Sequence, residues 1–212
     1  MTVGFFLIRF VHGFQNCRNG AAKIDGSKMK RGTSEVPDTK RVSSAVRSFE
    51  PIESRGARVL VLGSMPGTAS LLAGQYYAYA HNAFWPIMGA LFGAGPTLSY
   101  QKRILILRRA GVALWDVMAS CVRVGSLDAD IDDESIVAND FQTFFAAHPR
   151  VKRVFFNGTK AETCFYRYVR PYVSDRGLRF TRLPSTSPAY ASLSPAQKLK
   201  AWRAVADALA KK

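Results

Sequence analysis

The stretch Arg58-Val-Leu-Val-Leu-Gly-Ser-Met-Pro-Gly67 decides the fold of this chain. Its first half is a continuous apolar run, which is typical of a strand buried on both faces of a parallel sheet. Its second half is a turn bounded by glycine and proline. In an α/β fold such a turn lies at the carboxyl end of a strand, where these folds bind their ligands. We therefore expect an active site directly after Gly63.

Apolar runs and amphipathic segments alternate along the rest of the chain. They predict strands over 58–63, 111–116, 151–157 and 178–183, and helices over 84–93, 98–110, 133–147, 159–170 and 194–210. The last helix opens with Ser194-Pro195, an N-cap followed by proline at the first helical position. Strands that alternate with helices of this length predict an α/β fold whose parallel sheet is covered on both faces.

Composition divides the chain into two parts. Residues 1–45 are rich in Gly, Ser and Lys, contain the basic group Lys28-Met-Lys-Arg31 and show no sustained period. We expect a basic, disordered N-terminal extension there, with a DNA-gripping arm and an upstream start before Met29 as the alternatives. Residues 46–212 are expected to form one domain.

The chain is strongly basic. Its formal net charge is +15, and residues 58–212 alone carry 20 Lys and Arg against 10 Asp and Glu. A folded domain with this excess is expected to bind a polyanion, although a general alkaline bias of composition would look the same.

Cysteine and histidine usage excludes several kinds of site. The three cysteines lack short spacings, so a disulfide framework is not expected and a four-cysteine iron–sulfur cluster is excluded. The three histidines are scattered, so we expect no metal and no cofactor. The apolar run Gly4-Phe-Phe-Leu-Ile8 is too short for a membrane span, and we expect a cytoplasmic protein.

Aromatic and amide residues follow the turn, in Gln75-Tyr-Tyr77 and Asn82-Ala-Phe-Trp85. They suit a flat, hydrogen-bonding ligand such as a nucleobase. No lysine follows Gly67 at the spacing of a phosphate-binding loop.

Six blocks, in order between Ser48 and Lys211, resemble the uracil-DNA glycosylase superfamily and most closely its sixth family, the hypoxanthine or deoxyinosine DNA glycosylases: GSMPG, QYYA, NAFWPIMG, LWDVMASC, FFNGTKA and LPSTSPA. The resemblance implies a three-layer αβα sandwich around a four-stranded parallel sheet. It also implies a monomeric, monofunctional glycosylase that hydrolyses the N-glycosidic bond of uracil or hypoxanthine in DNA and so initiates base excision repair.

The resemblance assigns catalysis to two residues. Asn82 would orient the attacking water, because the position in the turn where other branches carry Asn or Asp is Met65 here. Asn82 would equally suit the N-cap of the helix after it. Asp116 matches the asparagine that reads the base edge in the uracil-specific branch. It would accept a ring N–H or compensate positive charge on the sugar; a turn cap or a salt bridge with Arg123 is the structural alternative.

The same blocks supply the pocket for the base. Tyr77 would stack on the extracted base, and Asn157 ends the third predicted strand, where the following amides could receive a phosphate or a base carbonyl. Gly63, Ser64 and Met65 would form the remaining wall.

The last block would contact the DNA backbone. Ser185, Thr186 and Ser187 would donate hydrogen bonds to phosphates, although relatives carry a histidine at the position of Ser185. Tyr190 would act as the wedge that fills the vacated stack, and Lys160 would contact a phosphate.

Other interpretations remain open. The acidic residues between Asp128 and Glu134 precede a predicted helix, where they suit its dipole better than a metal. Met65 and Ser185 also fit a catalytically weak protein that binds damaged or abasic DNA. A small hydrolase of free nucleosides is a third reading, which the basic charge disfavours.

Overall fold

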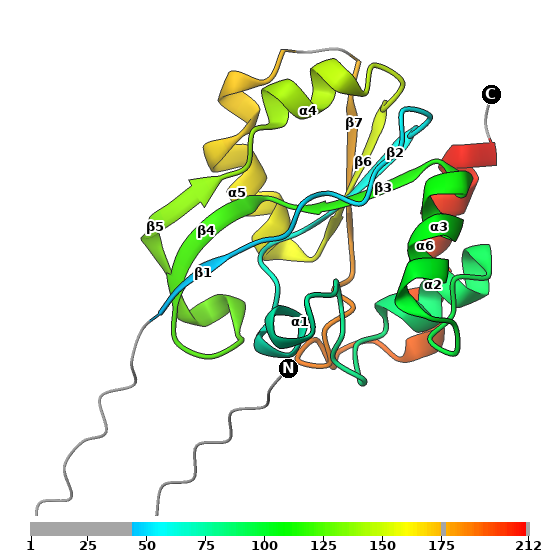
Figure 1. The fold of residues 1–212 in the computed structure, drawn as a ribbon, viewed down its shortest axis with the longest axis horizontal. Helices are drawn as coiled ribbons and strands as arrows, with labels where there is room; N and C mark the ends of the chain where they lie inside the picture. The colour runs from blue at the N-terminus through cyan, green and yellow to red at the C-terminus, as the bar shows by residue number, and fades with distance from the viewer. Residues whose placement is uncertain (1–43, 175–176, 211–212) are drawn as a thin grey trace, which may run out of the picture. The chain divides into compact units, whose positions relative to one another are not determined.

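The computed structural model describes residues 44–174 and 177–210 (Figure 1). Four of its strands form a parallel sheet in the order β3-β2-β6-β7: β2 Val59–Gly63, β3 Val112–Asp116, β6 Arg153–Asn157 and β7 Arg179–Leu183. All four predicted strands are therefore confirmed. Residues 1–43 of the predicted extension lie outside the described residues, and the strand β1 begins at Ser44.

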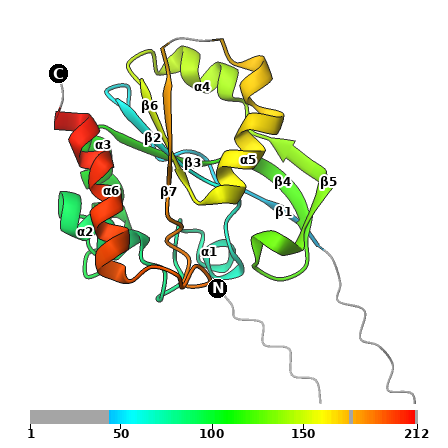
Figure 2. The same ribbon diagram turned by 180° about the vertical axis from the view of Figure 1, so that it is seen from behind.

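The described part of the chain has six α-helices around the sheet: α1 Thr68–Ala73, α2 Phe84–Phe92, α3 Tyr100–Ala110, α4 Phe141–Ala147, α5 Thr159–Tyr168 and α6 Pro195–Ala210. Figure 1 shows α4 and α5 on one side of the sheet and α2, α3 and α6 on the other, and Figure 2 shows the same layers from behind. The predicted three-layer αβα sandwich is thus confirmed. Ser194 and Gln197 bond reciprocally through side chains and amides at the start of α6, which is a capping box.

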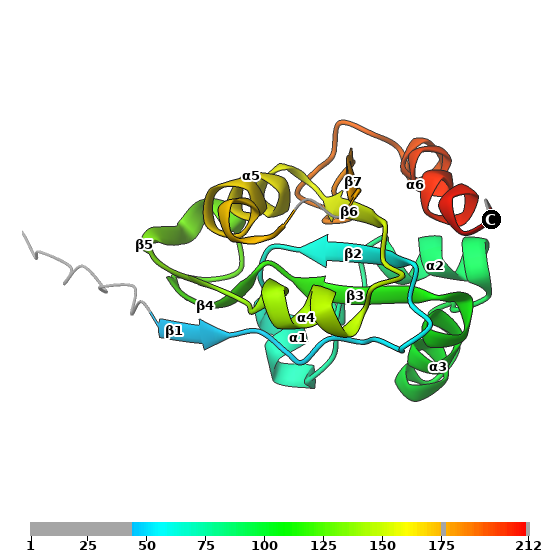
Figure 3. The same cartoon turned by 90° about the horizontal axis from the view of Figure 1, so that it is seen from above.

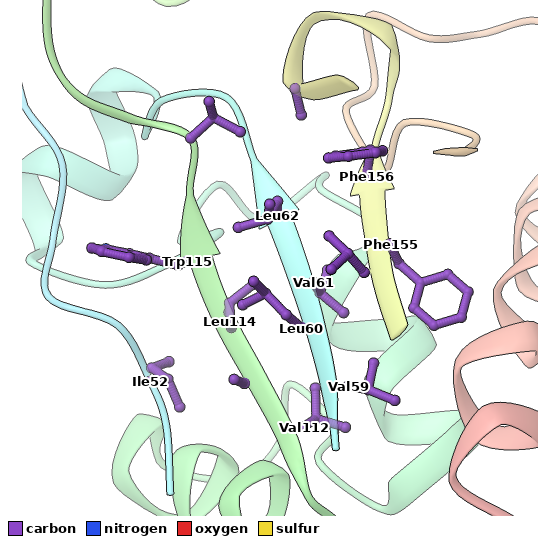
Figure 4. Packing of buried hydrophobic residues seen from close by; sticks show 14 of the residues in the cluster. Ile52, Val59, Leu60, Val61, Leu62, Val112, Leu114, Trp115, Phe155 and Phe156 are labelled. Atoms are coloured by element: carbon purple, nitrogen blue, oxygen red, sulfur yellow. The ribbon is translucent and has the colours of Figure 1, made fainter. Parts of the chain in front are cut away.

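The core lies between the central strands and these helices. Every residue of β2 and β3 is buried, as the continuous apolar runs predict. Figure 4 shows Leu60 and Leu62 on β2 and Leu114 on the adjacent β3, with Phe155 and Phe156 on β6 at the other side of β2. Apolar burial on this scale is what holds the strand ends, and so the site, in place.

The predicted helix over 133–147 is wrong in its first half. Residues Ile131–Ala138 form β5, which pairs antiparallel with β4, Met118–Arg123, and β4 pairs with β1, Ser44–Arg47. Figure 3 shows this second sheet at one end of the molecule, beside α5. The acidic residues therefore precede no helix; they lie in the 3-10 helix η1, Asp128–Asp130, and in β5. Cross-strand pairing with β4 is a long-range effect that outweighs the local helical pattern.

The topology fixes where a ligand binds. From β2 the chain continues to β3 on one side, and from β6 it continues to β7 on the other side. The strand order therefore reverses between β2 and β6. A doubly wound sheet binds its ligand at such a point, beyond the carboxyl ends of the strands. Gly63 and Asn157 are the last residues of these two strands.

Candidate active site

A cavity of about 860 Å³ lies at the carboxyl ends of β2, β3 and β6. In Figure 1 the loops after β2, β4 and β7 gather at this end of the sheet, around α1. Segments far apart in the sequence line it: 63–70, the aromatic stretch 76–82, Asp116, residues 126–129, Asn157 and the loop 185–190. The fold therefore brings the turn and the five other sequence blocks to one place.

Gly63 allows two functional groups to meet. A β-carbon at this position would overlap Oδ1 of Asp116 and would lie 2.9 Å from the hydroxyl of Tyr77. Both groups therefore pack directly against the glycine α-carbon, and only a residue without a side chain leaves room for them.

Asp116 is the most perturbed carboxyl group of the cavity. Its side chain is only 3% exposed, and the Ser48 hydroxyl donates a hydrogen bond of 2.8 Å to Oδ2. Burial raises the pKa of Asp116 to about 7, and the hydrogen bond from Ser48 offsets this only in part. The alternative of a salt bridge with Arg123 is not realised, because Arg123 Nη2 donates to the Pro66 carbonyl at 2.7 Å.

Tyr77 is fixed from two directions. Its ring stacks on Phe84 with centroids 4.1 Å apart and an interplanar angle of 19°, so one face of the ring is covered. Tyr77 has φ 53°, and it is the one non-glycine residue with positive φ in the described part of the chain. Strained backbone of this kind gathers at functional sites, where the surrounding structure holds it.

Asn157 joins Tyr77 to the last loop. Its Nδ2 donates to the Tyr77 hydroxyl at 3.0 Å and to Thr186 Oγ1 at 2.9 Å, while its Oδ1 accepts from the Thr186 amide at 2.8 Å. Both amide hydrogens and one lone-pair direction are thus used within the protein. Thr186 is fully buried, so it supports the loop from inside.

Asn82 lines the cavity two residues before α2 begins. Its Oδ1 accepts a hydrogen bond of 3.0 Å from the Phe84 amide, but the N-cap position that the sequence suggested for Asn82 belongs to Ala83. The next residue, Ala83, donates its amide to the Thr186 carbonyl at 3.0 Å. Within the described residues, no protein group accepts a hydrogen bond from the side-chain N–H groups of Asn82. Both groups can therefore bind a ligand or water in the cavity.

The turn after β2 contributes no strong polar side chain at its centre, since Met65 is buried in the core. Its neighbour Ser64 instead donates a hydrogen bond of 2.7 Å to Oδ1 of Asp128. Asp128 thereby becomes part of the cavity wall. Sequence reasoning missed this role because it placed the acidic residues just before a helix expected over 133–147, where they would suit the helix dipole.

The loop 184–194 forms the opposite lip. Ser185 and Ser187 line the cavity, and Ser185 Oγ accepts from the Ser187 amide at 3.2 Å. Lys198 of α6 supports the loop from below: its Nζ donates to the Ser187 carbonyl at 3.1 Å and lies 5.4 Å from the centre of the Tyr190 ring. Lys160 does not line the cavity and pairs with Asp133 at 2.6 Å.

Exposed apolar side chains surround the mouth. Several large hydrophobic residues that line the cavity are also largely exposed to solvent: Leu72, Tyr79, Leu127 and Tyr190. We call these four residues the apolar rim. Such a patch around a cavity marks a surface that meets a partner.

Within residues 44–174 and 177–210, no group of three or more His, Cys, Asp and Glu side chains is placed to hold a metal ion. None of the helices in these ranges has the length and apolarity needed to cross a bilayer.

Comparison with known proteins identifies the family. The model of the uracil DNA glycosylase superfamily matches residues 51–207. Two proteins called hypoxanthine DNA glycosylase are similar: the one from Methanosarcina barkeri is 36% identical over 116 residues (54% of this chain and 72% of that protein), and the one from Methanosarcina acetivorans is 32% identical over 160 residues (75% and 96%).

A solved structure shares the fold. The solution NMR structure of a candidate uracil DNA glycosylase from Methanosarcina acetivorans superposes with a TM-score of 0.65 at 31% identity, covering 79% of this chain and 99% of that one. The cavity thus lies where the sequence motifs place it, in a fold that a relative also adopts. The chain belongs to the uracil DNA glycosylase superfamily, and its class is that of a DNA glycosylase.

Proposed function

We propose that this glycosylase excises hypoxanthine and, as a second substrate, uracil from DNA by hydrolysis, and that it leaves an abasic site for base excision repair. One observation carries the proposal: the Asp116 carboxyl and the Tyr77 hydroxyl meet against Gly63 in a cavity of about 860 Å³. A volume in this range accommodates a purine as well as a pyrimidine. The relatives named hypoxanthine DNA glycosylase support the choice of purine.

Asp116 reads the chemical change that deamination makes. Deamination replaces an exocyclic amino group by a carbonyl, as adenine becomes hypoxanthine and cytosine becomes uracil. Ser48 donates to Oδ2, which leaves Oδ1 to carry the proton of the neutral acid. The Oδ1–H group then donates to the new carbonyl, whereas an amino group at that place would be a second donor and would be rejected.

The neutral form of Asp116 also assists departure of the base. As the glycosidic bond breaks, negative charge accumulates on the leaving base and its carbonyl oxygen. A donor in a site shielded from water stabilises that charge more than the ground state. The raised pKa of Asp116, about 7, keeps this donor available at neutral pH.

The remaining residues hold the nucleotide. The base stacks on the face of Tyr77 that Phe84 leaves uncovered, a contact that contributes about 1–3 kcal/mol. Asn82 orients the water with its side-chain N–H groups, since its Oδ1 already accepts from the Phe84 amide. The Gly63, Ser64 and Met65 turn closes the wall behind the base, and Asn157 positions Tyr77.

DNA lies across the mouth of the cavity. Ser185 and Ser187 donate hydrogen bonds to the phosphates beside the flipped nucleotide. Lys160 leaves its ion pair with Asp133 and contacts a more distant phosphate. Tyr190 enters the vacated stack. The exposure of the apolar rim supports a duplex as substrate, because a free nucleoside would leave those side chains in water.

The experiment is base release from oligonucleotides that each carry one hypoxanthine, uracil, xanthine or adenine, in single and double strands. Release is scored by alkaline cleavage, with free deoxyinosine as the comparison. We expect release of hypoxanthine first, then uracil, and none of adenine. Release from free deoxyinosine at the rate found in the duplex would contradict the proposal.

A second candidate function has one observation in its favour. Met65 is buried and offers no group to activate water, as in a protein that binds damaged DNA without turnover. The same oligonucleotides distinguish the two functions, because tight binding with no base release would favour the binding protein. Asn82→Ala then tests the mechanism: we expect single-turnover release to fall roughly 100-fold, and an unchanged rate would exclude Asn82 from catalysis.

A further inference from the structure

A group that accepts a proton from the attacking water speeds the hydrolysis of a glycosidic bond. In this chain the turn after β2 cannot supply it, since its central residue is Met65. The amide of Asn82 can orient a water but is a very weak base. The proposed function thus leaves one chemical role without a residue.

The cavity contains a second carboxyl group, to which the proposed function gives no role. Asp128, in η1 between β4 and β5, lines the same cavity as Tyr77, Asn82 and Asp116. It is fixed by the turn itself, because Ser64 donates a hydrogen bond of 2.7 Å to its Oδ1. Ser64 is the only hydrogen-bond donor to this carboxyl within residues 44–174 and 177–210, so Oδ2 is left to accept from another molecule.

The charged neighbours of Asp128 favour its ionised form without neutralising it. Arg123 of β4 is buried behind the turn, and its Nε and Nη1 have no hydrogen-bond partner among the residues described. The charge of Lys160 in α5 lowers the pKa of Asp128 less than that of Arg123 does, and its ammonium group is paired with Asp133. Neither forms a direct ion pair with Asp128, so the carboxylate keeps its basicity.

Two further groups of the cavity interact with the charge of Asp128. That charge disfavours ionisation of Asp116 in β3 and of Tyr77. Although Asp128 is exposed to solvent, desolvation raises its own pKa, and the Ser64 hydrogen bond opposes that effect. The pKa of Asp116 is raised further, to about 7, so the two carboxyl groups differ in acidity, as the two partners of acid–base catalysis do.

We propose that Asp128 is the catalytic base of the glycosylase, and that its Oδ2 accepts a proton from the water that attacks C1′ of the deoxyribose. The water oxygen forms the bond to C1′ while the glycosidic bond breaks. The electron pair of the glycosidic bond moves to the ring nitrogen of the base. The carbonyl of that base accepts the hydrogen bond from Asp116. Asp128 later gives the proton to the departing base, so the products are a neutral base and an abasic site.

This inference rests on the proposed function, and its test separates the two. Single-turnover release of hypoxanthine is measured between pH 5 and pH 9 for the wild type, Asp128→Asn, Ser64→Ala and Asp130→Asn. Asp130 is the matched control, because it lies in the same 3-10 helix but does not line the cavity. Binding to the same duplex and thermal melting are measured for every variant.

The expected results differ between the variants. Asp128→Asn should lower the rate roughly 100-fold with unchanged melting and DNA binding, and it should remove the rise of rate with pH on the acid side. Ser64→Ala, which loses only the anchor, should have a smaller effect, and Asp130→Asn none. Asp128→Ala should regain activity when formate is added, because formate supplies the missing carboxylate.

Other outcomes would overturn the inference. If the wild type releases the base and Asp128→Asn does so at the same rate and with the same pH profile, Asp128 is not the base. The proposed function would stay intact in that case. An equal loss in Asp130→Asn, or a failure of formate to restore any activity in a folded Asp128→Ala protein, would assign the effect to the loop instead. No release by the wild type from any strand would reject the proposed function itself.

Discussion

Asn157 donates a hydrogen bond of 3.0 Å to the hydroxyl of Tyr77, a residue from a different connection of the sheet. Its other amide hydrogen and its carbonyl oxygen bind Thr186. One side chain at the end of β6 therefore ties Tyr77 to the loop that contains Thr186. The residue that we propose to stack on the base and the loop that we propose to contact phosphates are positioned as one unit.

Replacing Asn157 should weaken both parts together. In Asn157→Ala the buried Thr186 amide would lose its acceptor, which costs about 1–3 kcal/mol of folding free energy. We expect slower base release as well, because the Tyr77 hydroxyl is no longer held. Urea denaturation and single-turnover kinetics measure the two effects.

Asn157→Asp is the comparison variant. Its carboxylate can still accept from the Thr186 amide but cannot donate to Tyr77, so stability should recover more than activity. Equal recovery of both quantities would argue against a separate role in positioning Tyr77.

Stability should depend on the protonation of Asp116. Its pKa rises from 3.8, the ordinary value, to about 7 in the folded protein, so the folded state binds a proton that the unfolded state has released. The stabilisation is complete below pH 3.8 and is lost as the pH rises through about 7. Asp116→Asn lacks this dependence. Between pH 5 and pH 8, the free energy of unfolding of Asp116→Asn should rise by roughly 2–3 kcal/mol relative to that of the wild type. Urea denaturation measures both values.

The same group should shape the activity profile. Since the neutral acid donates to the base carbonyl, hypoxanthine release should decline as the pH rises above about 7. In Asp116→Asn that decline should disappear, because an amide does not titrate in this range. A wild-type rate that is flat from pH 6 to pH 9 would contradict the donor role.

Gly63→Ala should separate the two groups that meet at this glycine. The new methyl group would overlap Asp116 Oδ1 and press on the Tyr77 hydroxyl, at a cost of about 1–3 kcal/mol and with a large loss of base release. Gly56→Ala is the control, since a β-carbon there has no neighbour closer than 4.0 Å. Equal activity of the two variants would show that the close approach at Gly63 is unimportant.

Tyr190→Ser should affect duplex substrates more than single strands. If Tyr190 fills the space left by the flipped base, its loss lowers release from duplex DNA, where the neighbouring bases must be kept apart. The exposed Tyr172, which is not part of the cavity wall, gives the control variant Tyr172→Ser. Gel assays on matched single and double strands measure the ratio, and a fall of equal size in both would not support a wedge.

Local patterns in the sequence determined much of this protein. The apolar runs of β2 and β3 are buried along their whole length, so their strand character can be recognised without knowledge of their partners. The Ser194-Pro195 start of α6 is equally local, since its capping contacts span three residues. The motif blocks also placed the cavity at the end of β2, because the carboxyl ends of parallel strands share one edge.

The tertiary structure decided what depends on contacts between distant segments. Residues 133–138 lie in a stretch whose pattern favours a helix, but pairing with β4 makes them part of a strand. Asp128, which the sequence placed before a helix N-terminus, instead lines the same cavity as Asp116. The pKa of Asp116 likewise depends on burial in the fold and on a hydrogen bond from Ser48, which lies 68 residues earlier in the chain. Such effects arise from long-range packing and desolvation, which no single stretch of sequence contains.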